Sequence, residues 1–372
     1  MDFLPQDWQQ GRFVGRIDRG EGPTPVIIEN GNVYDVSATA PTVSALLKTR
    51  FSTAGGKNLG RLQDLKFGQG DTRLLAPIDL QCVKAAGVTF AVSTIERVIE
   101  ERAHGDNTKA HEIRSLLNQR VGKDISSVKP GSDEAKHLKE ALMADGLWSQ
   151  YLEVAIGPDA EIFTKAPVLS SVTWGDEVGI RSDSHWNNPE PEIVLVCAPS
   201  GQVVGAMLGN DVNLRCFEGR SALLLGKAKD NNASCSVGPF IRLFDDSFTM
   251  DDVRRAEVRL EVTDDTGYRM EGVSNMAQIS RDPLDIVAQA ISEHHYPDGF
   301  VLFLGTLFAP TQDRDKPGLG FTHKIGDKVR ISSPKLGVLE NKVTTSKQAR
   351  AWNFGINDLM QNLAGRGLLK SA

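Results

Sequence analysis

Short apolar runs separated by turn-forming residues fill the chain after Tyr151. They have the length and the β-branched or aromatic content that strands favour. The runs are EIFTKAP, EVGIRSDS, EIVLVCAPSGQVVGAML, AEVRLEVTDDTGYRM, GFVLFLGTLFAP and KVRISSPKLGVLENKV, in that order. One helical pattern, PLDIVAQAISEHH, interrupts them. The pattern therefore predicts a β-rich α+β protein.

The start of the chain has a different pattern. GRIDRGEGPTPVIIENGNVYDVS alternates β-forming residues with Gly, Pro and Asn turns, which predicts a small sheet over residues 12–36, and a helical pattern follows at Thr42–Thr49. The polar, glycine-bearing stretch Ser52–Asp71 is predicted to be a loop. We therefore expect a small N-terminal α/β domain over residues 1–75 and a larger domain over residues 76–372.

Helical patterns follow this boundary. From Ser93 on, STIERVIEERAHG places apolar residues on one helical face and charged residues on the other. Two further helices are predicted at Ile113–Arg120 and Asp133–Ala144.

The charge of the chain argues against nucleic acid as its main partner. The 372 residues carry a formal net charge of −6, whereas phosphate binding depends on a basic surface. No apolar stretch approaches the roughly 18 residues of a membrane span, and MDFLPQDWQQGR lacks the pattern of a signal peptide. The four cysteines are widely spaced without a CxxC pair, as expected of reduced thiols. We expect a cytoplasmic protein with no membrane partner.

Two glutamates precede the apolar run IVLV at the start of a predicted strand. Glu190 and Glu192 are two positions apart, so in a strand both side chains point to the same face. Pro191 fits the first position of a strand, where a missing N–H matters least. A tight turn at Ser200 and Gly201 would then place Asp211 of the returning strand opposite Glu190.

Three carboxylates at one end of a hairpin have two interpretations. Cross-strand Cβ atoms lie roughly 5 Å apart, so the charges repel one another unless a cation compensates them. A divalent cation such as Mg²⁺ takes a few carboxylates and keeps waters that a substrate can displace. Alternatively, Glu190 and Glu192 only decorate an exposed strand end, and their spacing leaves both interpretations open.

Several motifs resemble those of the fumarylacetoacetate hydrolase family. Glu190-x-Glu192, a turn, and then GNDV followed by Arg215 resemble the metal-binding core of that family. LGTLFAP resembles its substrate loop, and KIGDKVRISSPKLGVLENKV resembles its closing segment. Asn213 and Cys216 stand where the GNDVSARD-like motif of the family has Ser and Asp, so the contacts of those two residues are not carried over.

The resemblance spans roughly residues 85–345 and implies a fold and a cofactor. It implies a mixed β-sheet roll as the catalytic domain, with lid helices at about residues 93–145. It also implies that Glu190, Glu192 and Asp211 hold Mg²⁺, for which Mn²⁺ or Ca²⁺ is expected to substitute.

Within the family, four stretches resemble the 2-keto-3-deoxy-D-pentonate dehydratases: AAGVTFAVSTIERVIEERA, LWSQYLEVAIGPDAEIFTKAP, DSHWNNPEPE and KAKDNNASCSVGPF. This resemblance implies a Mg²⁺-dependent hydro-lyase of pentose catabolism that converts 2-keto-3-deoxy-D-pentonate to 2,5-dioxopentanoate and water. The alternatives are a carbon–carbon hydrolase of a fumarylpyruvate-like diketo acid, a decarboxylase of an oxaloacetate-like acid, and a catalytically silent metal-binding subunit. A homodimer or homotetramer is expected.

The wider family uses a His-x-x-Glu pair on a lid helix. Alignment places Ser93 at the histidine and Glu96 at the glutamate, so the pair is incomplete here. Glu96 is the candidate base and Ser93 a candidate substrate contact. The same residues form a capping-box pattern that would start the helix, and both interpretations stay open.

The remaining candidates come from the same alignment. Lys229 aligns with the active-site lysine of the family, whose ammonium would stabilise enolate charge or assist the leaving hydroxyl, and Lys227 is its rival. Arg215 is expected to be a buried partner of the carboxylates. Thr306 is expected to hold the substrate carboxylate, and Lys165 is a weaker substrate-contact candidate.

Overall fold

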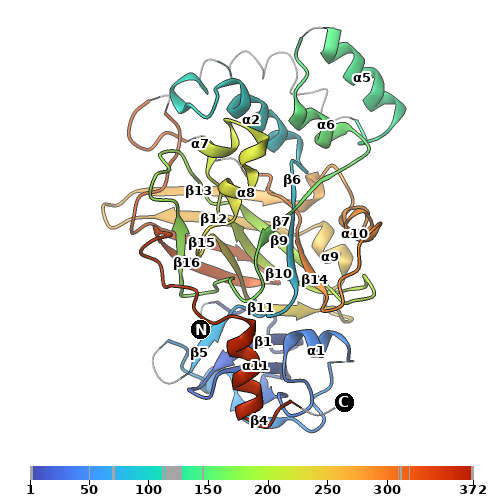
Figure 1. Cartoon of the computed structure of the whole chain (residues 1–372), viewed down its shortest axis with the longest axis vertical. Helices are drawn as coiled ribbons and strands as arrows, with labels where there is room; N and C mark the ends of the chain where they lie inside the picture. Colours follow the sequence, from blue (N-terminus) through green and yellow to red (C-terminus); the bar gives the residue numbers. More distant parts are fainter. Residues whose placement is uncertain are drawn as a thin grey trace.

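Two β-sheets form the body of the protein, as the computed structural model in Figure 1 shows. The structure describes residues 3–49, 51–68, 72–110, 113, 128–144, 146–308, 310, 312–317 and 319–369. The helix predicted at Ile113–Arg120 lies outside these residues except for Ile113, which is helical. Among the described residues, both sheets are mixed and helices are fewer than strands, which confirms the β-rich α+β class.

The larger sheet combines the N-terminal strands with strands from the middle of the chain. Its strands follow the order β4 (Lys57–Arg61), β3 (Asn32–Asp35), β2 (Pro23–Glu29), β1 (Phe13–Asp18), β11 (Cys235–Leu243), β10 (Val203–Asp211), β9 (Pro191–Cys197), β14 (Phe300–Phe303), β6 (Cys82–Gly87) and β7 (Glu161–Ala166), and β5 (Arg73–Leu75) also pairs with β1. Strands β1 to β3 lie within residues 12–36, where strands were predicted, but they belong to the larger sheet instead of forming a separate small one, because β1 pairs with β11. The domain boundary near residue 75 stays a prediction.

The smaller sheet packs against the larger one. Its order is β13 (Arg269–Asn275), β12 (Glu257–Thr263), β15 (Lys328–Ser333), β16 (Gly337–Thr345) and β8 (Glu177–Ile180). The strand β9 is buried on both faces, which explains its continuous apolar run. Ile193 and Leu195 enter the core shared with the smaller sheet, whereas Val194 and Val196 enter a second core on the opposite face.

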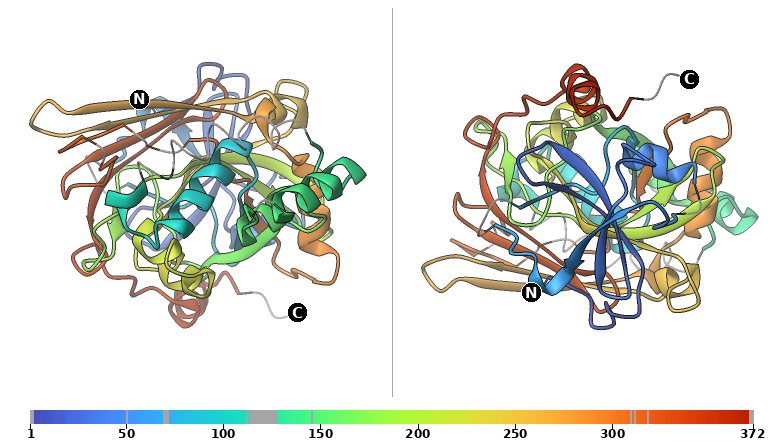
Figure 2. Two further views of the ribbon diagram at one scale, coloured as in Figure 1. Left: turned by 90° about the horizontal axis from the view of Figure 1, so that it is seen from above. Right: turned by 90° about the horizontal axis from the view of Figure 1, so that it is seen from below.

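Helices cover one end of this body. They are α2 (Ala91–Arg102), α5 (Asp133–Ala144), α6 (Gln150–Ile156), α7 (Arg215–Glu218) and α8 (Leu225–Lys229). Figure 1 shows them at the top, and the left view of Figure 2 shows α2, α7 and α8 over the strands. The helices α1 (Val43–Leu47), α9 (Met250–Arg254), α10 (Pro283–Ile291) and α11 (Ile356–Gly365) lie elsewhere on the sheets. The helices predicted at Thr42–Thr49, at Asp133–Ala144 and within PLDIVAQAISEHH are confirmed.

The structure corrects two local predictions. Ser52–Asp71 is not only a loop, because β4 and a 3₁₀ turn at Leu62–Asp64 lie within it. This edge strand is mostly exposed on both faces, so its sequence carries no alternation of apolar and polar residues. Ser93 does not cap α2, since the helix begins at Ala91 and the Ser93 hydroxyl donates to the Phe90 carbonyl at 2.8 Å. Across the described residues, the helices are all too short or too polar to cross a membrane.

Candidate active site

The hairpin of β9 and β10 brings the predicted carboxylates together. The register pairs Pro191 with Asn210 and Glu192 with Gly209, and the Asp211 N–H donates to the Glu190 carbonyl at 3.0 Å. Asp211 therefore lies opposite Glu190, and this predicted register is confirmed.

The three carboxylates form a tight, buried cluster. Glu190, Glu192 and Asp211 are only 4%, 3% and 2% exposed, and one oxygen of each lies within 4.8 Å of the others. The interpretation that the glutamates decorate an exposed strand end is therefore wrong. At 4.8 Å, and with an effective dielectric constant of about 20, two unit charges repel by about 3.5 kcal/mol, so the cluster needs cations.

Two lysines provide part of this compensation. The Lys229 ammonium lies 2.5 Å from Glu190 and 2.9 Å from Asp211, and the Lys165 ammonium lies 2.8 Å from the other Asp211 oxygen. Burial lowers the pKa of Lys229, but Asp211 and Glu190 outweigh burial, so its pKa is raised and the ammonium keeps its proton. The same ion pairs lower the pKa of Asp211 although burial alone would raise it.

The structure distinguishes the candidate lysines by position. Lys229 is 2% exposed and lines the cavity at the carboxylates, whereas Lys227 is exposed and lies over the Phe217 ring. Lys165 is fully buried behind the cluster and also donates to the Lys229 carbonyl. Lys165 thus positions Asp211 and the Lys229 backbone. It is not among the described residues that line the cavity, although it was predicted to contact the substrate.

A third cation reaches the cluster from α2. The Arg97 guanidinium pairs with Glu190, with Glu100 at 2.7 Å and with Glu218 at 3.0 Å. Burial lowers the pKa of Arg97, but these three carboxylates outweigh it and raise the pKa well above its ordinary value. Arg97 is thereby a fixed cation that ties α2 and α7 to the start of β9.

Arg215 of α7 and Glu96 of α2 form the outer part of this ion-pair network. Arg215 is buried and pairs with Glu100 at 2.8 Å and, more distantly, with Glu96 at 3.7 Å. Arg215 thus reaches the metal-binding carboxylates through Glu100 and Arg97, and its predicted role as their buried partner stays a prediction. Glu96 is not among the described residues that line the cavity, whereas Ser93, one turn before Arg97, is.

Glu192 differs from its two neighbours in its partners. One of its oxygens accepts the Gly305 N–H at 2.6 Å, and no described lysine, arginine or histidine lies within 4.0 Å of it. Burial and the charges of Asp211 and Glu190 raise the pKa of Glu192 well above its ordinary value. Thr306 follows Gly305 and lines the same cavity, so the predicted substrate loop does reach the site.

Glu161 is a fourth acidic group at the cavity. It begins β7 opposite Gly87 of β6, where a Cβ atom would lie 1.9 Å from the Glu161 carboxylate, so a larger residue at position 87 would force this carboxylate to shift. Burial and the nearby charge of Glu218 raise the pKa of Glu161 to about 7. Among the described residues, no cationic side chain lies within 4.0 Å of this carboxylate. Glu161 can therefore exchange a proton near neutral pH.

The whole cluster carries an excess of negative charge. Its carboxylates are Glu96, Glu100, Glu161, Glu190, Glu192, Asp211 and Glu218, and its cations are Arg97, Lys165, Arg215 and Lys229. Seven acids against four bases leave a formal charge of −3 when all are ionised. A divalent cation and one proton would balance this excess.

The residues present fit Mg²⁺. All three candidate ligands offer carboxylate oxygens, which Mg²⁺ prefers, and Glu192 has no cationic partner among the described residues. Lys229 and Arg97 neutralise only part of the negative charge of the carboxylates. The remaining negative charge favours binding of a further cation. Glu190, Glu192 and Asp211 would hold the ion.

Comparison with known proteins places the chain in a family. The model of the "Fumarylacetoacetate (FAA) hydrolase C-terminal" family matches residues 158–344, and the chain belongs to that family. A "Probable 2-keto-3-deoxyxylonate dehydratase" of Haloferax volcanii is 31% identical over 214 residues, which are 58% of this chain and 68% of that protein. A "2-dehydro-3-deoxy-D-arabinonate dehydratase" of Saccharolobus solfataricus is 30% identical over 193 residues, which are 51% of this chain and 59% of that protein.

Solved structures share the fold. A "2-keto-3-deoxy-D-arabinonate dehydratase complexed with magnesium and 2,5-dioxopentanoate" superimposes with a TM-score of 0.63 at 21% identity, covering 90% of this chain and 99% of that one. A fumarylacetoacetate hydrolase from Exiguobacterium antarcticum gives a TM-score of 0.55 at 17% identity with the same coverage. At these identities the likeness concerns the fold. The family and the dehydratases among its relatives make this chain an enzyme.

Three charged residues that line the cavity were not predicted from the sequence: Arg97, Glu161 and Glu218. Arg97 lies one helical turn after Ser93, and that spacing could have revealed it. No local pattern marks Glu161 or Glu218 as a site residue, because each reaches the cavity only through the packing of segments distant in sequence.

We expect Mg²⁺ to bind more tightly as the pH rises, because Glu192 must lose its proton to act as a ligand and its pKa is raised. Titration calorimetry in two buffers of different ionisation enthalpy would show proton release on binding. Glu192→Gln should abolish binding, and the exposed Glu293→Gln should not change it. Binding that is independent of pH and unaffected by Glu192→Gln would contradict the assignment.

Proposed function

We propose that the protein is a Mg²⁺-dependent dehydratase that converts 2-keto-3-deoxy-D-pentonate to 2,5-dioxopentanoate and water. The buried triad of Glu190, Glu192 and Asp211 next to the Lys229 ammonium carries this proposal. The names of the two relatives support the substrate class. A role in pentose catabolism and a homodimeric or homotetrameric assembly are part of the same proposal.

The first step is removal of a proton from C3 of the keto acid. Mg²⁺, when bound, polarises the 2-keto group and stabilises negative charge on its oxygen. Glu161 takes the C3 proton as a carboxylate, and the C–H electron pair forms the C2–C3 double bond of an enolate. Glu161 suits this role because it is the described cavity carboxylate with neither a cationic partner nor a place in the triad, and its pKa is about 7.

Loss of the C4 hydroxyl completes the reaction. The enolate electrons form a C3–C4 double bond as the C4–O bond breaks, and the protonated Glu161 returns its proton to the leaving oxygen, so water is released. Tautomerisation of the unsaturated alcohol gives the 5-aldehyde. Lys229 keeps its proton throughout and stabilises the enolate by its fixed charge. The base is thus proposed to be Glu161 in place of Glu96.

Access to the site requires movement of the covering side chains. The cavity at the carboxylates measures about 20 Å³, enough for a single water and too small for a five-carbon acid. Arg97 spans the cavity from α2 to Glu190, so its ion pairs must rearrange when substrate binds. The substrate carboxylate then provides a new partner for a cation, with Thr306 beside it.

One observation favours dehydration over carbon–carbon hydrolysis. Hydrolysis needs a water activated by a base, and the Ser93 hydroxyl, at the position of the family histidine, donates to the Phe90 carbonyl. A base is therefore missing at that position. A silent metal-binding subunit would have no need for Lys229 or for Glu161 with its raised pKa.

The direct test is an assay of the pure full chain with 2-keto-3-deoxy-D-pentonate and Mg²⁺. We expect 2,5-dioxopentanoate by NMR, and no turnover with EDTA or with Asp211→Asn. Glu293→Gln is the matched control and should retain full activity. Cleavage of a fumarylpyruvate-like diketo acid with no turnover of the pentonate would refute the proposal.

We also expect Glu161→Gln to lower kcat by about 10²- to 10⁴-fold with Mg²⁺ binding retained, because a general base is lost. In the wild type, Glu161 must be deprotonated to accept the C3 proton, so kcat should rise as the pH rises through about 7. This rising limb of the pH profile of kcat should be absent in Glu161→Gln. A variant that keeps both the rate and the limb would exclude Glu161 as the base, and Glu96→Gln would then be the next variant to measure.

A further inference from the structure

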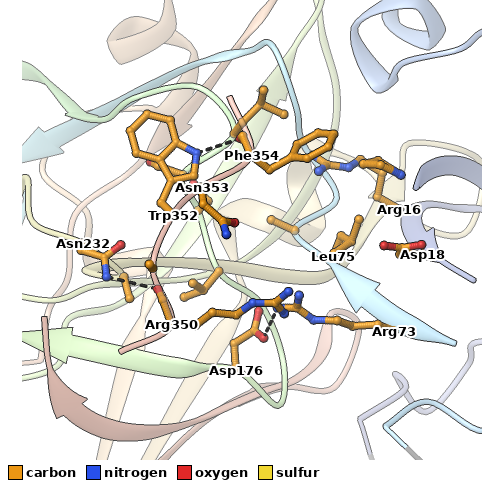
Figure 3. A pocket seen from close by; sticks show the side chains of 18 of the residues that line it. Arg16, Asp18, Arg73, Leu75, Asp176, Asn232, Arg350, Trp352, Asn353 and Phe354 are labelled. Atoms are coloured by element: carbon orange, nitrogen blue, oxygen red, sulfur yellow. Dashed lines mark hydrogen bonds and ion pairs between the residues drawn. The ribbon is translucent and has the colours of Figure 1, made fainter. Parts of the chain in front are cut away.

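A second cavity lies on the protein, away from the carboxylate site. It measures about 230 Å³ and shares no lining residue with the cavity at the triad. Figure 3 shows its walls, which come from β1 and β5, from residues 169–172 and from the C-terminal segment 350–354. Nothing in the proposed dehydration uses these residues.

The cavity contains a buried arginine without an acidic partner. Arg16 is 6% exposed, and within the described part of the chain its guanidinium has a single hydrogen bond, from Nη1 to the Ile78 carbonyl. Its Nε is buried without a partner, and no carboxylate of the described residues lies within 4.0 Å of the guanidinium. Burial lowers the pKa of Arg16, while Asp79 and Asp18 raise it too little to compensate. A buried charge of this kind is costly unless an anion pairs with it.

Other buried arginines of the described chain show how this cost is usually met. Arg242 forms a two-point pair with Asp7 at 2.6 and 2.8 Å. Arg281 also lacks a carboxylate within 4.0 Å, but it donates to four backbone carbonyls at 2.7 to 3.3 Å. Arg16 has neither a paired carboxylate nor several carbonyl acceptors. Because it lines an open cavity, a dissolved anion can supply the missing partner.

The charges around the cavity limit the charge of such an anion. The charged lining residues are Arg16, Arg73, Arg350, Asp18, Asp176 and Glu177, three of each sign. Arg73 is already paired with Asp176 at 2.7 Å. An anion with several charges would meet the acidic residues of the wall, whereas a single carboxylate can pair with Arg16 alone.

The uncharged lining residues indicate the rest of the ligand. Ser170, Ser171 and Asn232 already donate to other protein groups and can accept through their oxygens. Asn353 carries a further amide, and Leu75, Trp352 and Phe354 provide apolar contacts. Hydroxyl groups can donate to carboxylates and accept from amides and hydroxyls, so a hydroxylated chain matches this wall.

We propose that this cavity binds a small hydroxylated monocarboxylate, such as an open-chain sugar acid, with its carboxylate on Arg16. The cavity volume, the unpartnered buried guanidinium and the mixed polar wall carry this proposal. It does not depend on the activity at the triad.

D-gluconate and D-glucitol are matched probes, because they differ only in the carboxylate. Titration calorimetry of the full chain in EDTA, which keeps metal out of the triad, should show saturable binding of D-gluconate and none of D-glucitol. Arg16→Gln should weaken D-gluconate binding by about tenfold or more, as expected for loss of a charge-assisted hydrogen bond. Arg19→Gln is the control, since it removes the same charge from an exposed position three residues on and should bind as the wild type does.

Ala351→Trp provides a second test that keeps Arg16 in place. Ala351 lines the cavity and is exposed, so a large side chain there should block D-gluconate without disturbing the core. No binding of D-gluconate to the wild type would overturn the proposal. Equal binding of D-glucitol, or unchanged D-gluconate binding in both Arg16→Gln and Ala351→Trp, would also overturn it.

Discussion

Repulsion among three buried carboxylates is the constraint on which the rest of the site depends. The tight turn between β9 and β10 fixes Glu190, Glu192 and Asp211 within 4.8 Å of one another, where water cannot screen them. Lys229 and Arg97 are held in place by this negative charge, and their raised pKa values follow from it. Burying this cluster costs stability, and its excess of acids over bases makes it a suitable site for a divalent cation.

The covering helices are part of the same electrostatic system. Arg97 on α2 connects Glu190 at the start of β9 to Glu218 of α7. Lys229 is the last residue of α8, the α-helix that follows α7. Arg97 pairs with carboxylates of the helices and of the hairpin, so removing its charge would weaken the cover and the hairpin together. Under the proposed function, the carboxylate of the keto acid would compete for Arg97 and so loosen α2 from the hairpin.

Local patterns predicted the hairpin well because register follows from turn length and strand alternation. The pairing of Asp211 with Glu190 is a local property of about twenty residues, and it is confirmed. The contacts of α2 were not predictable in this way, since an amphipathic pattern gives a polar face and does not say which polar residue meets the site. Arg97 meets it, and Glu96 turns towards Arg215. Glu161 depends on β6 pairing with β7 across more than seventy residues, which no local pattern contains.

The most direct measurement of the central claim is a crystal structure with Mn²⁺ in place of Mg²⁺. The account predicts an anomalous-scattering peak between Glu190, Glu192 and Asp211, with the Lys229 ammonium displaced from at least one of its two carboxylates. A structure soaked in Mn²⁺ with no peak there, and with Lys229 still bridging Glu190 and Asp211, would contradict it.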